Sequence, residues 1–261
     1  MSFREALIPN GHITSQIRWI LVGVTVAVLF GSWLMVPASS LLPSPGEVLG
    51  AFSNLMDQGL MQNLLMSWKT NIQAIGLSCL ITIPLSYLTV VPAARPFVAA
   101  LSKLRFLGMT GLVVAFTLGF GGGHGLKLAL LTFGMGVFLI TSLYDIVESI
   151  PREEFDHART LRMGPWASVL EVVVLGHLDA VLDTVRQNAA MGWVMLSMVE
   201  GLVRFEGGLG AMMLAEDKHI NLAAVFALQL TVLVVGIGQD YLLALFKRWF
   251  CPYAFITLER Q

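Results

Sequence analysis

The stretch that decides the fold reads SIPREEFDHARTLRMGPWASVLEVVVLGHL and covers residues 149–178. It is the most polar and most sharply punctuated part of a chain that is otherwise mostly apolar. Pro151 opens it, and Gly164 and Pro165 interrupt it before an apolar run that begins with Trp166. Proline suits the first turn of a helix, and a Gly-Pro pair marks a turn. The stretch therefore predicts a water-exposed helix–turn–helix between two long apolar segments.

The composition predicts a membrane protein. Of the 261 residues, 56% are hydrophobic and 13% are charged, and the mean hydropathy is +0.76. Globular chains carry about 25% charged residues, so this chain cannot cover its surface with polar groups in water. Its apolar runs are ~20 residues long and lack strict alternation, which favours helices over a barrel. The predicted fold class is an all-α, polytopic membrane protein. The net charge of −1 gives no indication of a nucleic-acid partner, and none is predicted.

The apolar runs predict six membrane-spanning helices. They cover about 19–36, 62–91, 97–120, 126–147, 178–203 and 220–246. Ser44 and Pro45 predict the start of a short amphipathic helix over 46–56 at the membrane interface. Pro84 lies inside the second run, where its ring displaces a backbone hydrogen bond and is expected to kink the helix. The first run follows no evident cleavage site, so we interpret it as an uncleaved signal anchor.

The basic residues predict the orientation, because Lys and Arg concentrate on the cytoplasmic side. With a cytoplasmic N-terminus, the cytoplasmic side carries Arg4, Arg18, Arg95, Lys103, Arg105, Arg152, Arg159, Arg162, Lys247, Arg248 and Arg260. The opposite side carries only Lys127, Arg204 and Lys218. Both termini and the stretch 149–178 are therefore predicted to be cytoplasmic.

Motifs for catalysis and for metal binding are not evident in the sequence. FGGGHG (120–125) lacks the Lys-Ser/Thr pair of a phosphate-binding loop, and we interpret it as a close-packed turn. The five histidines have no i,i+4 pair, and Cys79 and Cys251 form no disulfide or metal framework. No G-x-S-x-G is present. We predict no catalytic residue, no metal and no cofactor bound by this chain.

The fifth run is unusually polar for a membrane span. Residues three and four apart share one face of a helix, and here that stripe comprises Asp183, Arg186, Ala190, Trp193, Ser197 and Glu200, flanked by Gln187. A charged group at membrane depth costs at least ~2.5 kcal/mol, so it faces a bundle interior or water. Two interpretations stay open, the wall of a polar pathway or an internal ion pair such as Arg186 with Asp183. Lys69 in the second run has the same two interpretations, and two cations on one cavity favour an anion or a zwitterion as solute.

The stretch 149–178 also has two interpretations, a solvated loop or a docking element. It is compact, and it presents apolar side chains beside its charges, namely Phe155, Leu161, Met163 and Trp166. That is more apolar surface than a solvated loop needs. A docking element for a soluble partner fits better.

Several motifs resemble those of the membrane permease subunits of bacterial ABC importers, in the nitrate/sulfonate/taurine group. In chain order they are LLPSPGEVLGAF (41–52), ITIPLSYL (81–88), IPREEFDHARTLRMGPW (150–166) and MVEGLVRFEGGLGAMM (198–213). The third is similar to that family's EAA loop, which reads Glu-Ala-Ala, three residues, Gly, nine residues, then Ile-x-Leu-Pro. Asp156, His157 and Ala158 stand at the first three positions, and Arg162 stands where the glycine is expected. At the end of the motif, Val172, Val174 and Leu175 replace the isoleucine, leucine and proline.

The resemblance implies a type I importer bundle and a mechanical role for the loop. It implies a cytoplasmic N-terminal segment (1–17), an anchor helix (18–37), a periplasmic interfacial segment (38–61), a five-helix core (62–246) with a coupling loop (149–177), and a cytoplasmic tail (247–261). The residues that would dock on the ATPase are Glu153, Glu154, Asp156, His157, Ala158, Arg159, Leu161, Arg162, Gly164 and Trp166. The residues assigned to the pathway are Lys69, Asp183, Arg186, Gln187, Trp193, Ser197 and Glu200.

The resemblance also implies the partners. These are a dimer of cytoplasmic ABC ATPases that binds ATP and Mg²⁺, a second permease copy or homologue, a periplasmic or lipid-tethered solute-binding protein, and membrane lipid. The chain itself would be no enzyme. It would be a multi-pass protein of the bacterial inner membrane that imports a small anion or organic acid of the nitrate, sulfonate, taurine or bicarbonate type. The alternative class is a membrane-embedded enzyme or a non-transporting scaffold.

Overall fold

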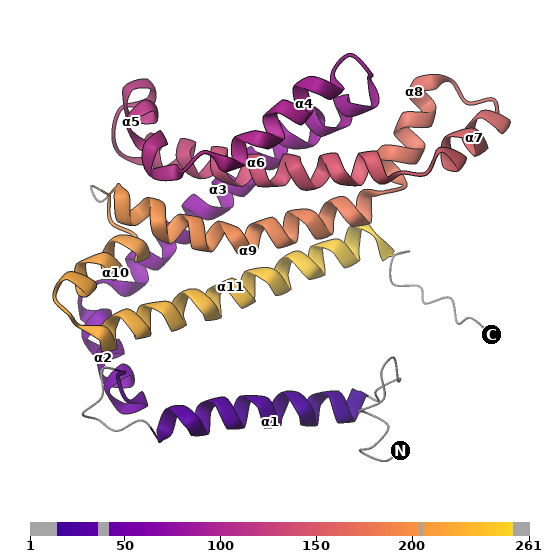
Figure 1. Ribbon diagram of the computed structural model, residues 1–261. Helices are drawn as coiled ribbons and strands as arrows, with labels where there is room; N and C mark the ends of the chain where they lie inside the picture. Colours follow the sequence, from indigo (N-terminus) through magenta and orange to yellow (C-terminus); the bar gives the residue numbers. More distant parts are fainter. Residues whose placement is uncertain (1–14, 36–41, 204–205, 253–261) are drawn as a thin grey trace.

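A computed structural model describes residues 15–35, 42–203 and 206–252, and every regular element in those ranges is helical (Figure 1). The predicted all-α class is confirmed. The bundle is built from α3 (Leu60–Tyr87), α6 (His124–Ser149), α9 (Leu178–Leu202) and α11 (Leu222–Phe250), with α6 packed on α3 and α9, and α11 packed on α9. The described residues do not include most of the predicted segment 1–17, the tail beyond 252, or Arg204.

Four described helices are long and apolar enough to cross a membrane, namely α1 (Ser15–Leu34), α3 with its 3-10 extension η2 (Leu88–Val90), α6 and α11. A bent pair supplies a fifth span if its two halves are counted together. α9 has 25 residues but is not among these four apolar helices, and it contains four charged residues, Asp179, Asp183, Arg186 and Glu200. Six spans therefore stay a prediction that depends on α9 crossing the membrane as part of the bundle.

The third predicted span is not one continuous helix. α4 (Arg95–Ser102) and the 3-10 turn η3 (Lys103–Phe106) form one half, and α5 (Met109–Phe120) forms the other, with a bend of 111° between them. Leu107 and Gly108 lie at the break, and both have extended backbone angles that no helix can continue through. The prediction of a single span over 97–120 is wrong in this respect.

The predicted interfacial helix is α2 (Pro45–Asp57), and its N-terminus has the expected cap. The Ser44 hydroxyl accepts a hydrogen bond from the Glu47 amide, and Glu47 accepts one from the Ser44 amide at 2.8 Å. This reciprocal pair is a capping box, so the predicted role of Ser44 is confirmed. Val48, Ala51 and Leu55 form the buried face of α2, which packs on α11.

α3 and α6 form the longest helix contact of the bundle. The Ser78 hydroxyl donates to the Thr132 carbonyl at 3.1 Å, and Gly136 leaves room for the Thr82 methyl group. α3 continues through Pro84 and ends at Tyr87, so this proline falls in the last turn of the helix. The small and hydroxyl-bearing residues permit a close approach of the two helices.

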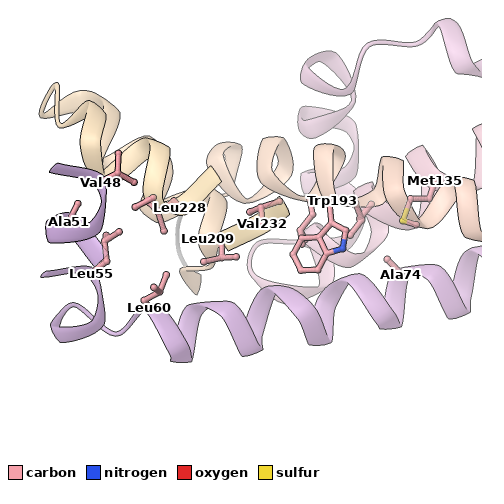
Figure 2. Packing of buried hydrophobic residues seen from close by; sticks show 14 residues of the cluster. Val48, Ala51, Leu55, Leu60, Ala74, Met135, Trp193, Leu209, Leu228 and Val232 are labelled. Carbon is pink, nitrogen blue, oxygen red and sulfur yellow. The ribbon is translucent and has the colours of Figure 1, made fainter. Parts of the chain in front are cut away.

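The main core lies where α2, α3, α6, α9, α10 (Leu209–Lys218) and α11 converge (Figure 2). Its buried members include Leu55, Leu60, Met135, Trp193 and Leu228, which come from five of those helices. Residues distant in the chain thus share one apolar cluster, which fixes α2 and α10 against one end of the bundle.

α1 stands apart from the bundle along most of its length (Figure 1). None of its spanning window is buried, and Trp19 and Leu29 are exposed. Only Trp33 near its C-terminal end packs against the core, and its indole nitrogen donates to the Pro43 carbonyl at 3.0 Å. The side chains of α1 therefore face lipid or another protein chain.

Candidate coupling loop and transport pathway

The first half of the predicted loop is the short helix α7 (Arg152–Thr160), which follows directly on α6. Pro151 precedes it in an extended conformation and ends α6 at Ser149. Glu153 and Glu154 lie in its first turn and Arg159 in its last, where each charge complements the helix dipole. Of its residues only Ala158 is buried. The sequence therefore produces a solvated helix whose terminal charges complement its dipole.

Arg162 ends α7 in the left-handed conformation, with φ of 56°. The Met163 amide donates to the Ala158 carbonyl at 3.2 Å, and the Arg162 amide donates to the Arg159 carbonyl at 2.9 Å. These two bonds define a Schellman motif, whose left-handed residue is usually glycine. The resemblance to the EAA pattern noted in the sequence aligns its glycine with this position. Arg162 thus adopts the left-handed backbone conformation that is usual for glycine and is sterically unfavourable for arginine.

The second half of the loop turns back toward the bundle. Gly164 is extended and caps α8 (Pro165–Ser168), and the Ser168 hydroxyl donates to the Gly164 carbonyl at 3.1 Å. The segment Val169–Leu175 then continues as a π-helix, and the Gly176 amide donates to the Glu171 carbonyl at 2.9 Å. Leu175, which replaces the proline of the EAA pattern, ends this widened segment just before α9.

A groove of about 560 Å³ lies between α7 and the π-helical segment. Of the ten predicted coupling residues, it brings together Glu153, Glu154, His157, Ala158 and Leu161. Asp156 and Arg159 pair with each other at 2.9 Å outside the groove. Leu161 and Trp166 are 61% and 73% exposed at the tip of the loop. The loop thus presents a small charged groove beside two open apolar side chains.

The predicted pathway residues do not form one open face in this chain. Lys69 and Gln187 are exposed, Asp183, Arg186 and Ser197 are half-buried, and Trp193 and Glu200 are buried. The stripe of residues on α9 is therefore partly exposed at its N-terminal end, at Asp183 and Arg186, and buried toward its C-terminal end, at Glu200.

Two ion pairs connect α9 to α11 at the end of the bundle next to α7. The Arg186 guanidinium contacts both carboxylate oxygens of Asp240, at 2.5 and 2.8 Å, and the Lys247 ammonium lies 2.5 Å from Asp183. The ion pair left open for Arg186 thus exists, but its partner is Asp240 and not Asp183. Asp240 was missed because it lies in the most apolar run, although a lone acid in such a run is itself a signal.

Glu200 holds the start of α10. The Ser67 hydroxyl lies 2.7 and 2.8 Å from the two Glu200 carboxylate oxygens, and it accepts a hydrogen bond from the Leu209 amide at 2.9 Å. The Gly210 amide donates to Glu200 at 2.9 Å. Because the Glu200 side chain is only 1% exposed, these partners satisfy a buried carboxylate.

The turn before α10 is fixed from two further helices. The Lys127 ammonium, from α6, donates to the Gly207 carbonyl at 2.6 Å, and Asn63, from α3, accepts from the Gly208 amide at 2.7 Å. Gly207 and Gly208 both have positive φ, at 72° and 109°, which a side chain rarely adopts. The sequence placed Lys127 at the start of the fourth run and counted it among the basic residues of the non-cytoplasmic side, whereas in the structure it is 2% exposed inside α6.

Trp193 belongs to a second buried polar cluster. Its indole nitrogen and the Asn71 amide both donate to the Gln239 carbonyl oxygen, at 3.2 and 3.1 Å. Asn188 donates to the Met135 carbonyl at 3.1 Å. These bonds join α3, α6, α9 and α11 at one level of the bundle. Among the described residues, no group of three His, Cys, Asp or Glu is placed to hold a metal.

No protein-family model and no curated protein matches this sequence. The fold does resemble solved structures. One of them is described as inward facing conformations of the MetNI methionine ABC transporter, with a TM-score of 0.60 and 17% sequence identity. The match covers 74% of this chain and 95% of that chain. At this identity the similarity defines the fold, so the chain has an all-helical fold that resembles an ABC importer permease, as predicted.

Proposed function

We propose that this chain is the membrane-spanning permease subunit of an ATP-driven importer. The observation that carries the proposal is α7, a compact, solvent-exposed helix joined to two bundle helices of an importer-like fold. Its groove and its open Leu161 and Trp166 side chains suit a protein partner, because apolar side chains supply affinity while surrounding charges set the register. The partner is a cytoplasmic ABC ATPase dimer, which binds ATP and Mg²⁺.

Force on α7 has a short route into the bundle. Only Ile150 and Pro151 separate α6 from α7, and only Gly176 and His177 separate the π-helical segment from α9. A push on the loop therefore acts on both helices, which pack on α3 and α11. Rocking of packed helices about a central site is a common way to alternate access. The complete transporter would contain a second permease copy and a periplasmic or tethered binding protein in the bacterial inner membrane, with both termini of this chain cytoplasmic.

The solute in this proposal is a small anion or organic acid. Lys69 supports it, because it is an exposed cation on α3. Arg186 supports it less than the sequence indicated, since Asp240 already neutralises its charge. Nitrate, sulfonate, taurine and bicarbonate fit this charge, and a zwitterionic amino acid fits it as well. Uptake by proteoliposomes with each radiolabelled solute tests the choice, and uptake of a cation alone would contradict it.

Co-purification tests the class of protein. The chain is expressed together with an ABC ATPase and a solute-binding protein from the same genome, and the complex is isolated through a tag on this chain. We expect ATP hydrolysis to rise when binding protein and solute are added. A preparation that never associates with an ATPase, yet shows an activity of its own, would instead identify a membrane enzyme. A preparation with neither property would identify a scaffold.

A further inference from the structure

A deep apolar pocket lies between α3, α6 and the bent pair α4–α5. Its volume is about 530 Å³, within the roughly 300–1,000 Å³ that is usual for ligand pockets. Ser78 and Thr82 line it, but their hydroxyls already donate to the backbone carbonyls of Thr132 and Ser78, at 3.1 and 2.7 Å. The Thr132 hydroxyl also lines the pocket and has no hydrogen-bond partner among the described residues, but most of the other lining residues are apolar. The pocket therefore suits a hydrocarbon chain and not a polar solute.

The bend of 111° creates this pocket. Leu101 and Leu104 line it from the first half of the pair, and Phe116 and Phe120 line it from the second half. A straight helix would place these side chains along one line, whereas the bend folds them around a common space. On the α6 side the wall contains small residues, among them Ala129, so the pocket reaches deep into the bundle.

Two cations are the chain neighbours of a residue that lines the pocket. Leu104 lines it, and Lys103 and Arg105 flank Leu104 on η3 with exposed side chains. Within the described part of the chain, neither cation forms a salt bridge. The Arg105 guanidinium lies over the Phe106 ring, 5.1 Å from its centre. Both charges are therefore available to an anion at the edge of an apolar pocket.

These cations lie near the level where the bundle leaves the hydrocarbon region. The Thr141 hydroxyl lies 3.3 Å from the Ser102 carbonyl, which places the start of η3 beside Thr141 of α6. Asp145 and Glu148 follow within two turns of α6, and both are exposed. Charged side chains mark the membrane–water boundary, and Lys and Arg near it extend toward the lipid headgroups.

We propose that this pocket binds an acyl chain of an anionic phospholipid, with Lys103 and Arg105 holding the phosphate of its headgroup. The apolar lining selects the acyl chain, and the two cations at its edge select the negative charge. An apolar helix of another protein would fill the pocket but would leave both cations without a partner. Basic pockets between helices are a known way to hold anionic headgroups. The site does not depend on which solute the protein transports.

Native mass spectrometry tests the proposal. The protein is purified in neutral detergent and titrated with dioleoyl-phosphatidylglycerol or with dioleoyl-phosphatidylcholine, which have the same acyl chains. We expect one tightly held phosphatidylglycerol per chain. The K103Q/R105Q double variant is expected to weaken it by roughly tenfold to thirtyfold, with little change for phosphatidylcholine. Ala129→Phe, which places a bulky ring in the pocket, is expected to remove the tight binding of phosphatidylglycerol and to weaken any binding of phosphatidylcholine. K218Q and Ala215→Phe make the same changes at exposed sites on α10 and serve as controls.

Equal retention of both lipids by every variant would overturn the proposal. So would tight binding of phosphatidylglycerol by an Ala129→Phe protein with unchanged gel-filtration elution and helical content. A photoreactive benzoylphenylalanine at Ile81 in the otherwise native chain gives an independent readout, whether or not Ala129→Phe folds. Cross-links to added phosphatidylglycerol support the proposal, whereas cross-links to a second copy of this chain contradict it.

Discussion

The Ser67 hydroxyl bridges both carboxylate oxygens of Glu200, at 2.7 and 2.8 Å, although 133 residues separate the two in the chain. Both side chains are almost fully buried. The contact joins α3 to α9 and at the same time fixes the first turn of α10 through the Leu209 amide. One serine thus connects three helices at this end of the bundle.

Ser67→Ala is expected to lower the free energy of unfolding by about 1–3 kcal/mol, because it leaves a buried carboxylate with fewer hydrogen bonds. Thermal unfolding in detergent measures the change. Thr25→Ala removes an equivalent hydroxyl from exposed α1 and is expected to change stability by less than about 0.5 kcal/mol. Equal effects of the two substitutions would show that the Ser67–Glu200 contact contributes nothing of its own.

Arg162→Gly is expected to stabilise the loop by about 1 kcal/mol, since glycine adopts the left-handed conformation without the steric cost that arginine bears. Hydrogen exchange of the amides at the end of α7 measures it. Arg159→Gly, three residues earlier and inside the helix, is the matched control. It is expected to have the opposite sign and a similar size. Faster exchange in the Arg162→Gly protein would contradict the assigned strain.

Leu161→Asp and Trp166→Asp are expected to uncouple ATP hydrolysis from transport in the assembled complex. Each places a charge on an open apolar side chain of the proposed docking surface, and a charge without a partner disfavours burial in an interface. The measurement is the ratio of solute imported to ATP hydrolysed in proteoliposomes. Lys218→Asp, on exposed α10, is expected to leave the ratio unchanged. Retained coupling in both loop variants would place the docking surface elsewhere.

The Arg186–Asp240 pair is expected to show a coupling energy of about 1 kcal/mol in a double-mutant cycle with alanine. It is bidentate, but its side chains are 39% and 41% exposed, so solvent weakens it. Thermal unfolding at low and high salt measures the coupling. The Asp156–Arg159 pair on α7 is more exposed and serves as the comparison, with an expected coupling below about 0.5 kcal/mol. A larger coupling in that pair would contradict the assignment.

The helices and their ends could be predicted from the sequence because local signals define them. The Ser44 cap, the short charged α7 and the long apolar runs depend on residue type and spacing within a few positions. The bend at Leu107 and Gly108 could not be predicted in this way. Lys103 and Arg105 interrupt the run just before the bend, but the bend itself depends on the extended backbone angles of the next two residues, which hydropathy does not indicate.

The partners of the charged residues were harder to predict than the residues themselves. The stripe on α9 was found from its periodicity, but Asp240, Ser67 and Lys127 reach it from other helices. Such contacts depend on helix packing, which a single sequence does not determine. In the same way, Arg162 could be aligned with a glycine position, but its left-handed backbone became evident only with the hydrogen bonds around it.

The two ends of the bundle are held by different kinds of contact. At the end near α10, the Glu200 carboxylate and the Lys127 ammonium are buried, and salt in solution barely reaches them. At the end near α7, the Arg186–Asp240 and Asp183–Lys247 pairs are partly open to solvent. Rising ionic strength is therefore expected to weaken the ion pairs near α7 and to leave the buried contacts near α10 unchanged. The end of the bundle that carries α7 is thus the end whose contacts respond to the salt concentration.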